Sequence, residues 1–214
     1  MEIYLSDFLT LALAHFVALL SPGVDFFIIL TNSSKYGRIS GIITSAGIAF
    51  ANLVYILLAL FGITLIKDNE VVFTSLKILG SFYLIYIGFL LLSSKKRKLF
   101  NKKIEIQKTK KDIFRYFSIG FLSAILNPKN SIFYFTMFSI SIKDSTPFYI
   151  QSFYASWMFL AVLFWDIFIV YLVTNSKSRI FLEKYSNFIE KISGIILFII
   201  GSFIILNSFQ HFSL

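Results

Sequence analysis

Six long apolar runs constrain the fold of this chain more than any other feature of its sequence. They lie at roughly 5–30, 40–66, 71–93, 114–141, 149–174 and 187–210. Each run is long enough to cross a bilayer as a helix, which takes about 20 residues. Backbone groups find no water in hydrocarbon, and these runs are continuous rather than alternating, so the sequence predicts helices rather than barrel strands. We therefore expect an all-α integral membrane protein with six transmembrane helices.

The composition agrees with a polytopic membrane protein. Hydrophobic residues make up 57% of the chain and charged residues only 14%, whereas soluble domains carry roughly 45–50% and about 25%. The net charge of +9 lies in short segments between the apolar runs, which argues against nucleic-acid binding. The chain has no cysteine, which excludes disulfides, thiolate metal sites and thiol redox chemistry. We expect one transporter domain over residues 1–214, with no cofactor and no bound metal.

The placement of lysine and arginine predicts the orientation in the membrane. The segments after the first, third and fifth runs are basic, and the longest of them covers about 95–113. The alternate segments hold few lysines, with acidic residues beside them. By the positive-inside rule, the basic segments lie in the cytoplasm and both termini lie outside. For the basic segment 95–111, a solvated loop is favoured over a nucleotide or anionic-lipid site.

Two of the apolar runs are interrupted near their middle by a proline and by polar or charged residues. These residues are Pro22, Gly23 and Asp25 in the first run, and Asn127, Pro128 and Lys129 in the fourth. Proline breaks a helix, and the glycine after it permits a bend and the close approach of a ligand. Asn127 is a favoured N-cap for a helix that begins at Pro128, and a helix N-terminus inside the membrane attracts a carboxylate. One such break alone indicates a proline kink, but the matched pair favours a transport site.

Four ionisable residues lie well inside the predicted spans: His15, Asp25, Lys129 and Asp166. Charged groups at the bilayer centre cost about 2.5–3.5 kcal/mol each, so we expect them to face a cavity or one another. Asp25, Lys129 and Asp166 can neutralise one another. Asn52, in the middle of the second run, is a further candidate ligand contact, with an interhelical hydrogen bond as the alternative. For His15 a structural role is favoured, because nothing around it indicates metal ligands.

The two halves of the chain resemble each other. The third run opens with Lys77-Ile78-Leu79-Gly80 and the sixth with Lys191-Ile192-Ser193-Gly194, and the broken runs correspond through their prolines. Three helices per half is an odd number, so the second half must sit inverted in the membrane. We therefore expect two inverted three-helix repeats, at about 1–94 and 114–214, as in many secondary transporters.

Motifs along almost the whole chain resemble the lysine exporter / homoserine–threonine resistance (LysE/RhtB) family of bacterial amino-acid exporters. The main ones are Ser21-Pro22-Gly23-Val24-Asp25, Tyr36-Gly37-Arg38, Gly120-Phe121-Leu122 and Leu126-Asn127-Pro128-Lys129. Val24 stands where the family usually has a second proline, which removes one of the two breaks expected there. The resemblance implies a six-helix inner-membrane exporter of small amino acids or related metabolites, driven by the proton gradient.

Three functions are compatible with these features. In an amino-acid exporter, Lys129 and the helix N-termini would hold the substrate carboxylate, while Asp25 or Asp166 would face the ammonium or carry the coupled proton. A cation or heavy-metal exporter is the alternative, with the two acids and Asn52 as ligands. A membrane-embedded enzyme is disfavoured, because the chain lacks a His-rich or Ser-His cluster. The expected partners are an amino acid, protons and membrane lipid, and a homo-oligomer is left open.

Overall fold

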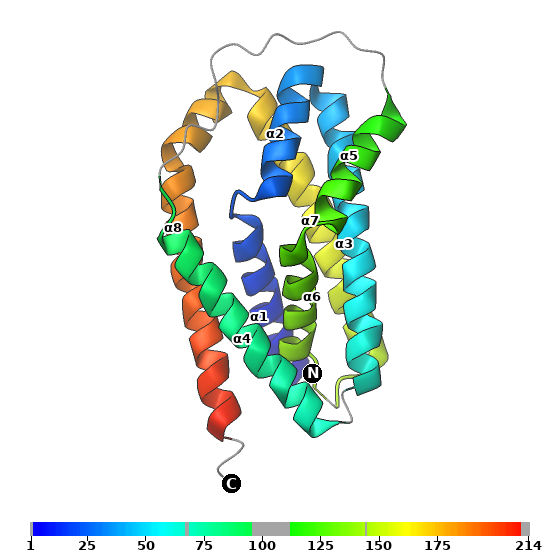
Figure 1. The fold of residues 1–214 in the computed structure, drawn as a ribbon, viewed down its shortest axis with the longest axis vertical. Coiled ribbons are helices and arrows are strands. Elements are labelled where there is room, and N and C mark those ends of the chain that lie inside the picture. Colours follow the sequence, from blue (N-terminus) through cyan, green and yellow to red (C-terminus); the bar gives the residue numbers. More distant parts are fainter. Residues whose placement is uncertain (1, 67–68, 96–111, 144, 211–214) are drawn as a thin grey trace.

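The computed structural model describes residues 2–66, 69–95, 112–143 and 145–210, and all regular structure in these residues is helical. The described helices are α1 (Glu2–Leu19), α2 (Val24–Tyr36), α3 (Arg38–Ile66), α4 (Glu70–Leu92), α5 (Ile113–Ile125), α6 (Pro128–Ser141), α7 (Phe148–Thr174) and α8 (Ser176–Gln210), labelled in Figure 1. The predicted all-helical class is confirmed. Most of the predicted basic loop, residues 96–111, lies outside the described residues.

Four of the described helices, α3, α4, α7 and α8, are each long and apolar enough to cross a membrane. A fifth span results if α1 and α2, whose axes differ by 53° across a short break, count as one. The fourth predicted run instead forms α5 and α6, of 13 and 14 residues, which are shorter than the about 20 residues of a spanning helix. By length and composition the described part of the chain therefore has four or five spans. The six apolar runs of the sequence predict six.

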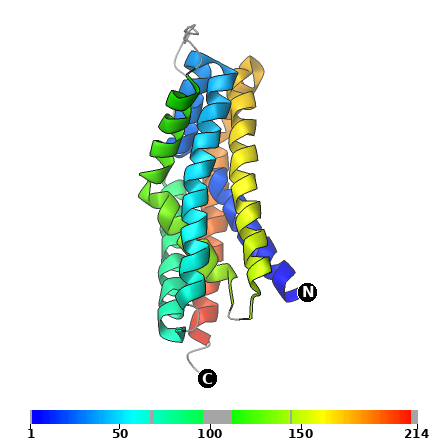
Figure 2. The same cartoon turned by 90° about the vertical axis from the view of Figure 1, so that its right-hand side faces the viewer.

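The helices form an elongated bundle (Figures 1 and 2). Glycines bring the backbones of neighbouring helices close together. A Cβ atom added at Gly47 of α3 would lie 2.1 Å from the carbonyl oxygen of Phe117 on α5. One added at Gly120 of α5 would lie 2.1 Å from the carbonyl oxygen of Thr44 on α3. Small residues permit such close helix packing in membranes, where no hydrophobic effect drives helices together.

Large apolar side chains remain exposed along the long helices. Examples are Leu57, Phe89, Phe164 and Phe203, which belong to α3, α4, α7 and α8. In water such surfaces would favour aggregation, but in a bilayer they face hydrocarbon. The distribution of apolar side chains therefore agrees with a membrane protein.

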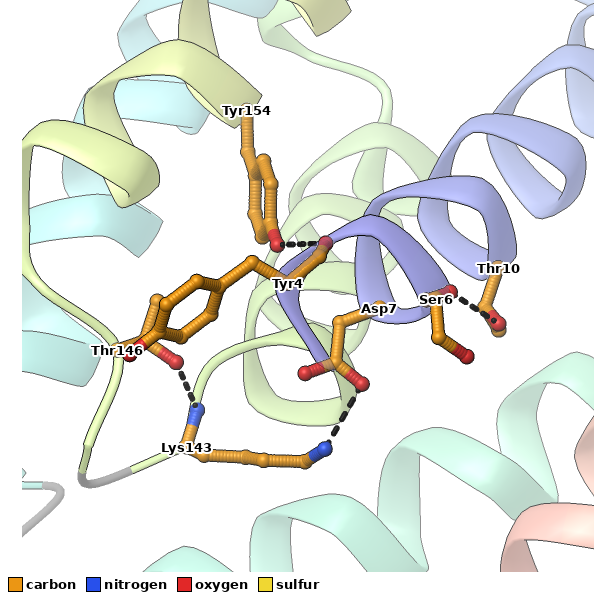
Figure 3. A network of polar contacts seen from close by, with 7 residues as sticks. All are labelled: Tyr4, Ser6, Asp7, Thr10, Lys143, Thr146 and Tyr154. Atoms are coloured by element: carbon orange, nitrogen blue, oxygen red, sulfur yellow. Dashed lines mark hydrogen bonds and ion pairs between the residues drawn. The ribbon is translucent and has the colours of Figure 1, made fainter. Parts of the chain in front are cut away.

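The N-terminal end of α1 and the C-terminal end of α8 lie at the same end of the bundle (Figures 1 and 2). At this end, polar contacts join α1 to α7 and to the α6–α7 connection (Figure 3). The Lys143 ammonium lies 2.9 Å from the Asp7 carboxylate, and the Tyr154 hydroxyl donates to the Tyr4 carbonyl at 2.8 Å. The Tyr4 hydroxyl donates to the Ser145 carbonyl at 3.1 Å. We call these contacts the α1–α7 network.

Candidate functional site

Both predicted interruptions separate two helices inside the bundle. α1 ends at Leu19, and Gly23 is the N-cap residue of α2. α5 ends at Ile125, and Asn127 is the N-cap residue of α6. The Asn127 side chain accepts a hydrogen bond from the Lys129 amide at 3.1 Å, which is the capping role expected from the sequence. Two helices thus begin within the bundle, and their N-terminal dipoles favour negative charge there.

A cavity of about 100 Å³ lies where these two helix starts meet α1, α3 and α7. Six of the eight residues predicted for the site line it: Gly23, Asp25, Asn52, Asn127, Lys129 and Asp166. Pro22 is not among the described lining residues, and the side chain of Pro128 lies outside the part of the chain that the structure describes. Pro22 lies in the connection between α1 and α2, and Pro128 is the first residue of α6. The fold therefore brings together the ionisable residues that the sequence leaves far apart.

Asp25 is anchored by two side-chain donors from the second half of the chain. The Ser123 hydroxyl on α5 donates to Oδ1 and the Asn130 amide on α6 donates to Oδ2, both at 3.1 Å. Asn130 also donates to the Ala124 carbonyl at 3.3 Å, so its amide is shared between two acceptors. The Asp25 carboxylate thus links α2 to both helices that flank the second interruption.

Lys129 lies in the first turn of α6 and lines the cavity. Its ammonium interacts electrostatically with Asp25, but no direct salt bridge joins the two groups in the described residues. Its carbonyl accepts a hydrogen bond from the Tyr83 hydroxyl on α4 at 3.0 Å. Tyr83 therefore tethers the start of α6 to α4.

Three further cavity residues carry buried polar atoms without a partner among the described residues. They are Oδ2 of Asp166, Oδ1 of Asn52 and both ring nitrogens of His15. His15 is 1% exposed, Asn52 4% and Asp166 7%. Buried polar groups in proteins are nearly always hydrogen-bonded, to protein or to water. Three helices thus contribute buried polar atoms with unused hydrogen-bonding capacity to residues that line one cavity.

Sequence reasoning missed Ser123 and Asn130, which hold Asp25, and Tyr134 and Trp165, which line the cavity. Asn130 lies inside the second interruption, so its polarity beside Lys129 was a usable signal. Ser123 and the two aromatic residues carry no such signal, because serine and aromatic residues are common throughout membrane helices.

The family model of LysE type translocators matches residues 16–208, which is most of the chain. The chain belongs to this family. The matched range contains both interruptions and every charged residue that lines the cavity. The resemblance found in the short motifs is thereby confirmed.

Three relatives illustrate the similarity of this LysE type translocator to known proteins. The threonine efflux protein of Escherichia coli K12 is 30% identical over 64% of this chain and 68% of its own length. The uncharacterized membrane protein YrhP of Bacillus subtilis is 29% identical over 82% of this chain and 87% of its own length. An uncharacterized membrane protein of Haemophilus influenzae is 27% identical over 95% of this chain and 98% of its own length. No solved structure matches the chain.

Proposed function

We propose that this translocator exports amino acids from the cytoplasm and that the cavity is its substrate site. The observation that carries the proposal is one cavity within the bundle that is lined by a cation, two carboxyl groups and two helix N-termini. A zwitterion needs both signs of charge within a few ångströms, whereas a simple anion or cation needs only one. The threonine efflux relatives support the same substrate class.

The charged groups divide between the two ends of the zwitterion. The substrate carboxylate binds near the Lys129 ammonium and the first turn of α6, where both the side-chain charge and the helix dipole are positive. The substrate ammonium faces Asp166, because its Oδ2 is unpartnered in the described residues. Asp25 is less available for this role, since both of its oxygens already accept hydrogen bonds.

We also propose that export is coupled to the proton gradient. The difference in hydrogen bonding between Asp25 and Asp166 indicates which of them carries the proton. A proton carrier must gain and lose its proton during the cycle, so its hydrogen bonds have to change with the state of the transporter. Asp25 is anchored by Ser123 and Asn130, whereas Oδ2 of Asp166 has no hydrogen-bond partner among the described residues. We therefore assign the coupled proton to Asp166, with Asp25 as the rival.

We further propose that 1–214 is one domain of six spans, with α1–α2 and α5–α6 as two broken spans, in two inverted repeats. α4 and α8, the third helices of the two repeats, pack antiparallel, as an inverted repeat requires (Figure 1). Gly88 of α4 lies against Gly194 of α8, and Gly201 of α8 lies against Ser81 of α4. Alternating access would come from rocking of the two repeats, which the α1–α7 network joins at one end.

This topology predicts on which side of the membrane Ser94 and Leu214 lie. Reporter fusions after Ser94 should show a cytoplasmic reporter and fusions after Leu214 an external one, because an odd number of spans separates them. Paired fusions to alkaline phosphatase, which is active only outside, and to a fluorescent protein, which is bright only inside, would measure this. Cytoplasmic signals from both positions would mean that α5 and α6 do not form one span.

The substrate site predicts that Lys129→Met reduces export of a labelled amino acid about ten- to hundredfold. The reason is that a hydrogen bond to a charged group contributes about 1.5–3 kcal/mol, and tenfold corresponds to about 1.4 kcal/mol. Membrane vesicles loaded with radiolabelled L-threonine would be assayed for efflux. Lys177→Met is the matched control, because Lys177 is an exposed lysine at the start of α8, outside the cavity.

Equal efflux from wild type and Lys129→Met would contradict the proposed site. The cation-exporter alternative is tested by loading the same vesicles with Zn²⁺. In the described residues, no group of three or more His, Cys, Asp and Glu side chains is arranged to hold a metal ion. Efflux of Zn²⁺ without efflux of any amino acid would replace the proposal by that alternative.

A further inference from the structure

We infer that His15 and Asn52 contact the substrate's side chain, and that they favour a neutral hydrogen-bonding group there over an apolar group of the same shape. The inference rests on the proposed function, because it assigns a part of the same cavity. It also reverses the structural role that the sequence favours for His15.

The two residues combine deep burial with unused hydrogen-bonding capacity. Both ring nitrogens of His15 and Oδ1 of Asn52 are buried without a partner among the described residues. Leaving a buried donor or acceptor unsatisfied costs about 1–3 kcal/mol. Both residues line the cavity, so a ligand bound there lies next to their side chains.

The other unpartnered buried atoms of the described residues are different in kind. They belong to Asp7 in the α1–α7 network and to four serines elsewhere in the bundle: Ser33, Ser45, Ser141 and Ser193. A serine hydroxyl in a helix can rotate to donate to a carbonyl of its own preceding turn. The two ring nitrogens of His15 are held further from the backbone of their own helix, so the same rearrangement does not satisfy them.

Aromatic rings hold the His15 imidazole in place. The ring centroids of Phe133, Tyr134 and Trp157 lie 5.8, 5.9 and 5.6 Å from that of His15. No carboxylate is hydrogen-bonded to the imidazole among the described residues. An uncharged imidazole in such a frame offers one donor and one acceptor. A substrate hydroxyl or amide matches this pair, since each of these groups can also donate and accept.

The charged residues of the cavity do not recognise the substrate's side chain. Asp25, Lys129 and Asp166 are complementary to the ammonium and carboxylate that all amino acids share, so they cannot distinguish one side chain from another. His15 and Asn52 are the uncharged polar side chains of α1 and α3 in the cavity wall. An apolar side chain placed against these two residues would leave the imidazole unsatisfied.

Competition between L-threonine and L-valine tests the inference, because the two amino acids have nearly the same shape and differ in one hydroxyl group. In vesicles loaded with both labelled amino acids, we expect the wild type to export threonine at least about tenfold faster than valine. A site built to hydrogen-bond a hydroxyl discriminates strongly against the analogue that lacks it. His15→Phe keeps a planar ring but removes both nitrogens, so the threonine-to-valine ratio should fall towards one while valine export persists.

Two further variants separate polarity from packing. Asn52→Leu, which removes the second polar group without touching α1, should also lower the ratio. Trp157→Phe is the control, because it changes one ring packed on His15 but removes no polar atom from the cavity wall. It should leave the ratio within about twofold of the wild type.

The outcomes distinguish this inference from the proposed function. Equal export of threonine and valine by the wild type would overturn the side-chain assignment alone, since amino-acid export would stand. The side-chain assignment would also be overturned if His15→Phe kept the wild-type ratio of threonine to valine export. If His15→Phe does not fold, the same ratio measured in Asn52→Leu decides. A wild type that exports neither amino acid would remove the proposed function and this inference with it.

Discussion

Replacing Asp166 with asparagine should abolish uphill export, while exchange of substrate across the membrane persists at a reduced rate, because the amide oxygen can still accept a hydrogen bond from the substrate ammonium. Asparagine keeps the size of the side chain and its ability to hydrogen-bond, but its amide does not gain or lose a proton near neutral pH. A transporter without its proton carrier can still change between its two open states when substrate is bound, so exchange continues. It can no longer use the proton gradient, so accumulation against a substrate gradient is lost.

Two assays on the same vesicles would measure this effect. Counterflow of labelled against unlabelled threonine reports exchange, and export driven by an imposed pH gradient reports coupling. Asp25→Asn is the informative comparison. Because the variant has one acceptor oxygen where Asp25 has two, and loses the negative charge near Lys129, we expect both exchange and uphill export to fall. Uphill export at the wild-type rate in Asp166→Asn would show that Asp166 is not the carrier and would favour Asp25.

Replacing Gly120 with alanine should destabilise the protein by about 3 kcal/mol or more. The added Cβ would lie 2.1 Å from the Thr44 carbonyl oxygen, and a backbone atom of a packed helix cannot rotate away as a side chain can. α3 and α5 would have to separate, and overpacking of this kind typically costs about 1–3 kcal/mol even where side chains can adjust. Thermal or detergent-induced unfolding of the purified protein would measure the free energy of unfolding.

Gly62→Ala is the matched control, because Gly62 lies in the same α3 helix and its added Cβ would meet only the Phe135 ring, at 3.2 Å. The ring can shift, and alanine is about 1 kcal/mol more favourable than glycine in a helix, so this variant should stay within about 1 kcal/mol of the wild type. Unchanged stability of Gly120→Ala would mean that α3 and α5 do not approach this closely.

The cavity that contains Asp166 and the close contact between α3 and α5 are connected parts of the molecule. The close packing of α3 and α5 holds Ser123 of α5 near Asp25 and brings Asn52 of α3 to the cavity. A change that separates these helices should therefore weaken the site as well as the fold. The Asp166 substitution, in contrast, should leave the free energy of unfolding nearly unchanged, since the affected oxygen has no partner in the described residues.

The sequence by itself determined the features that depend on short stretches of chain. Hydrophobic length predicts the all-helical membrane class, the polar interruptions mark where α2 and α6 begin, and Asn127 before Pro128 predicts the N-cap of α6. Motifs along the chain also indicated the LysE family. Each of these depends on residues only a few positions apart, so local rules of helix formation and membrane partitioning suffice.

Only the tertiary structure decided which side chains meet. Ser123 and Asn130 hold Asp25 from about 100 positions away, and His15 lines the cavity although its sequence context favours a structural role. In a membrane helix that is apolar on all sides, hydrophobic periodicity does not reveal which face points inward. The rotation of each helix is set instead by close contacts such as Gly47 and Gly120 between α3 and α5. These contacts depend on shape across the whole bundle, and no single stretch of sequence contains them.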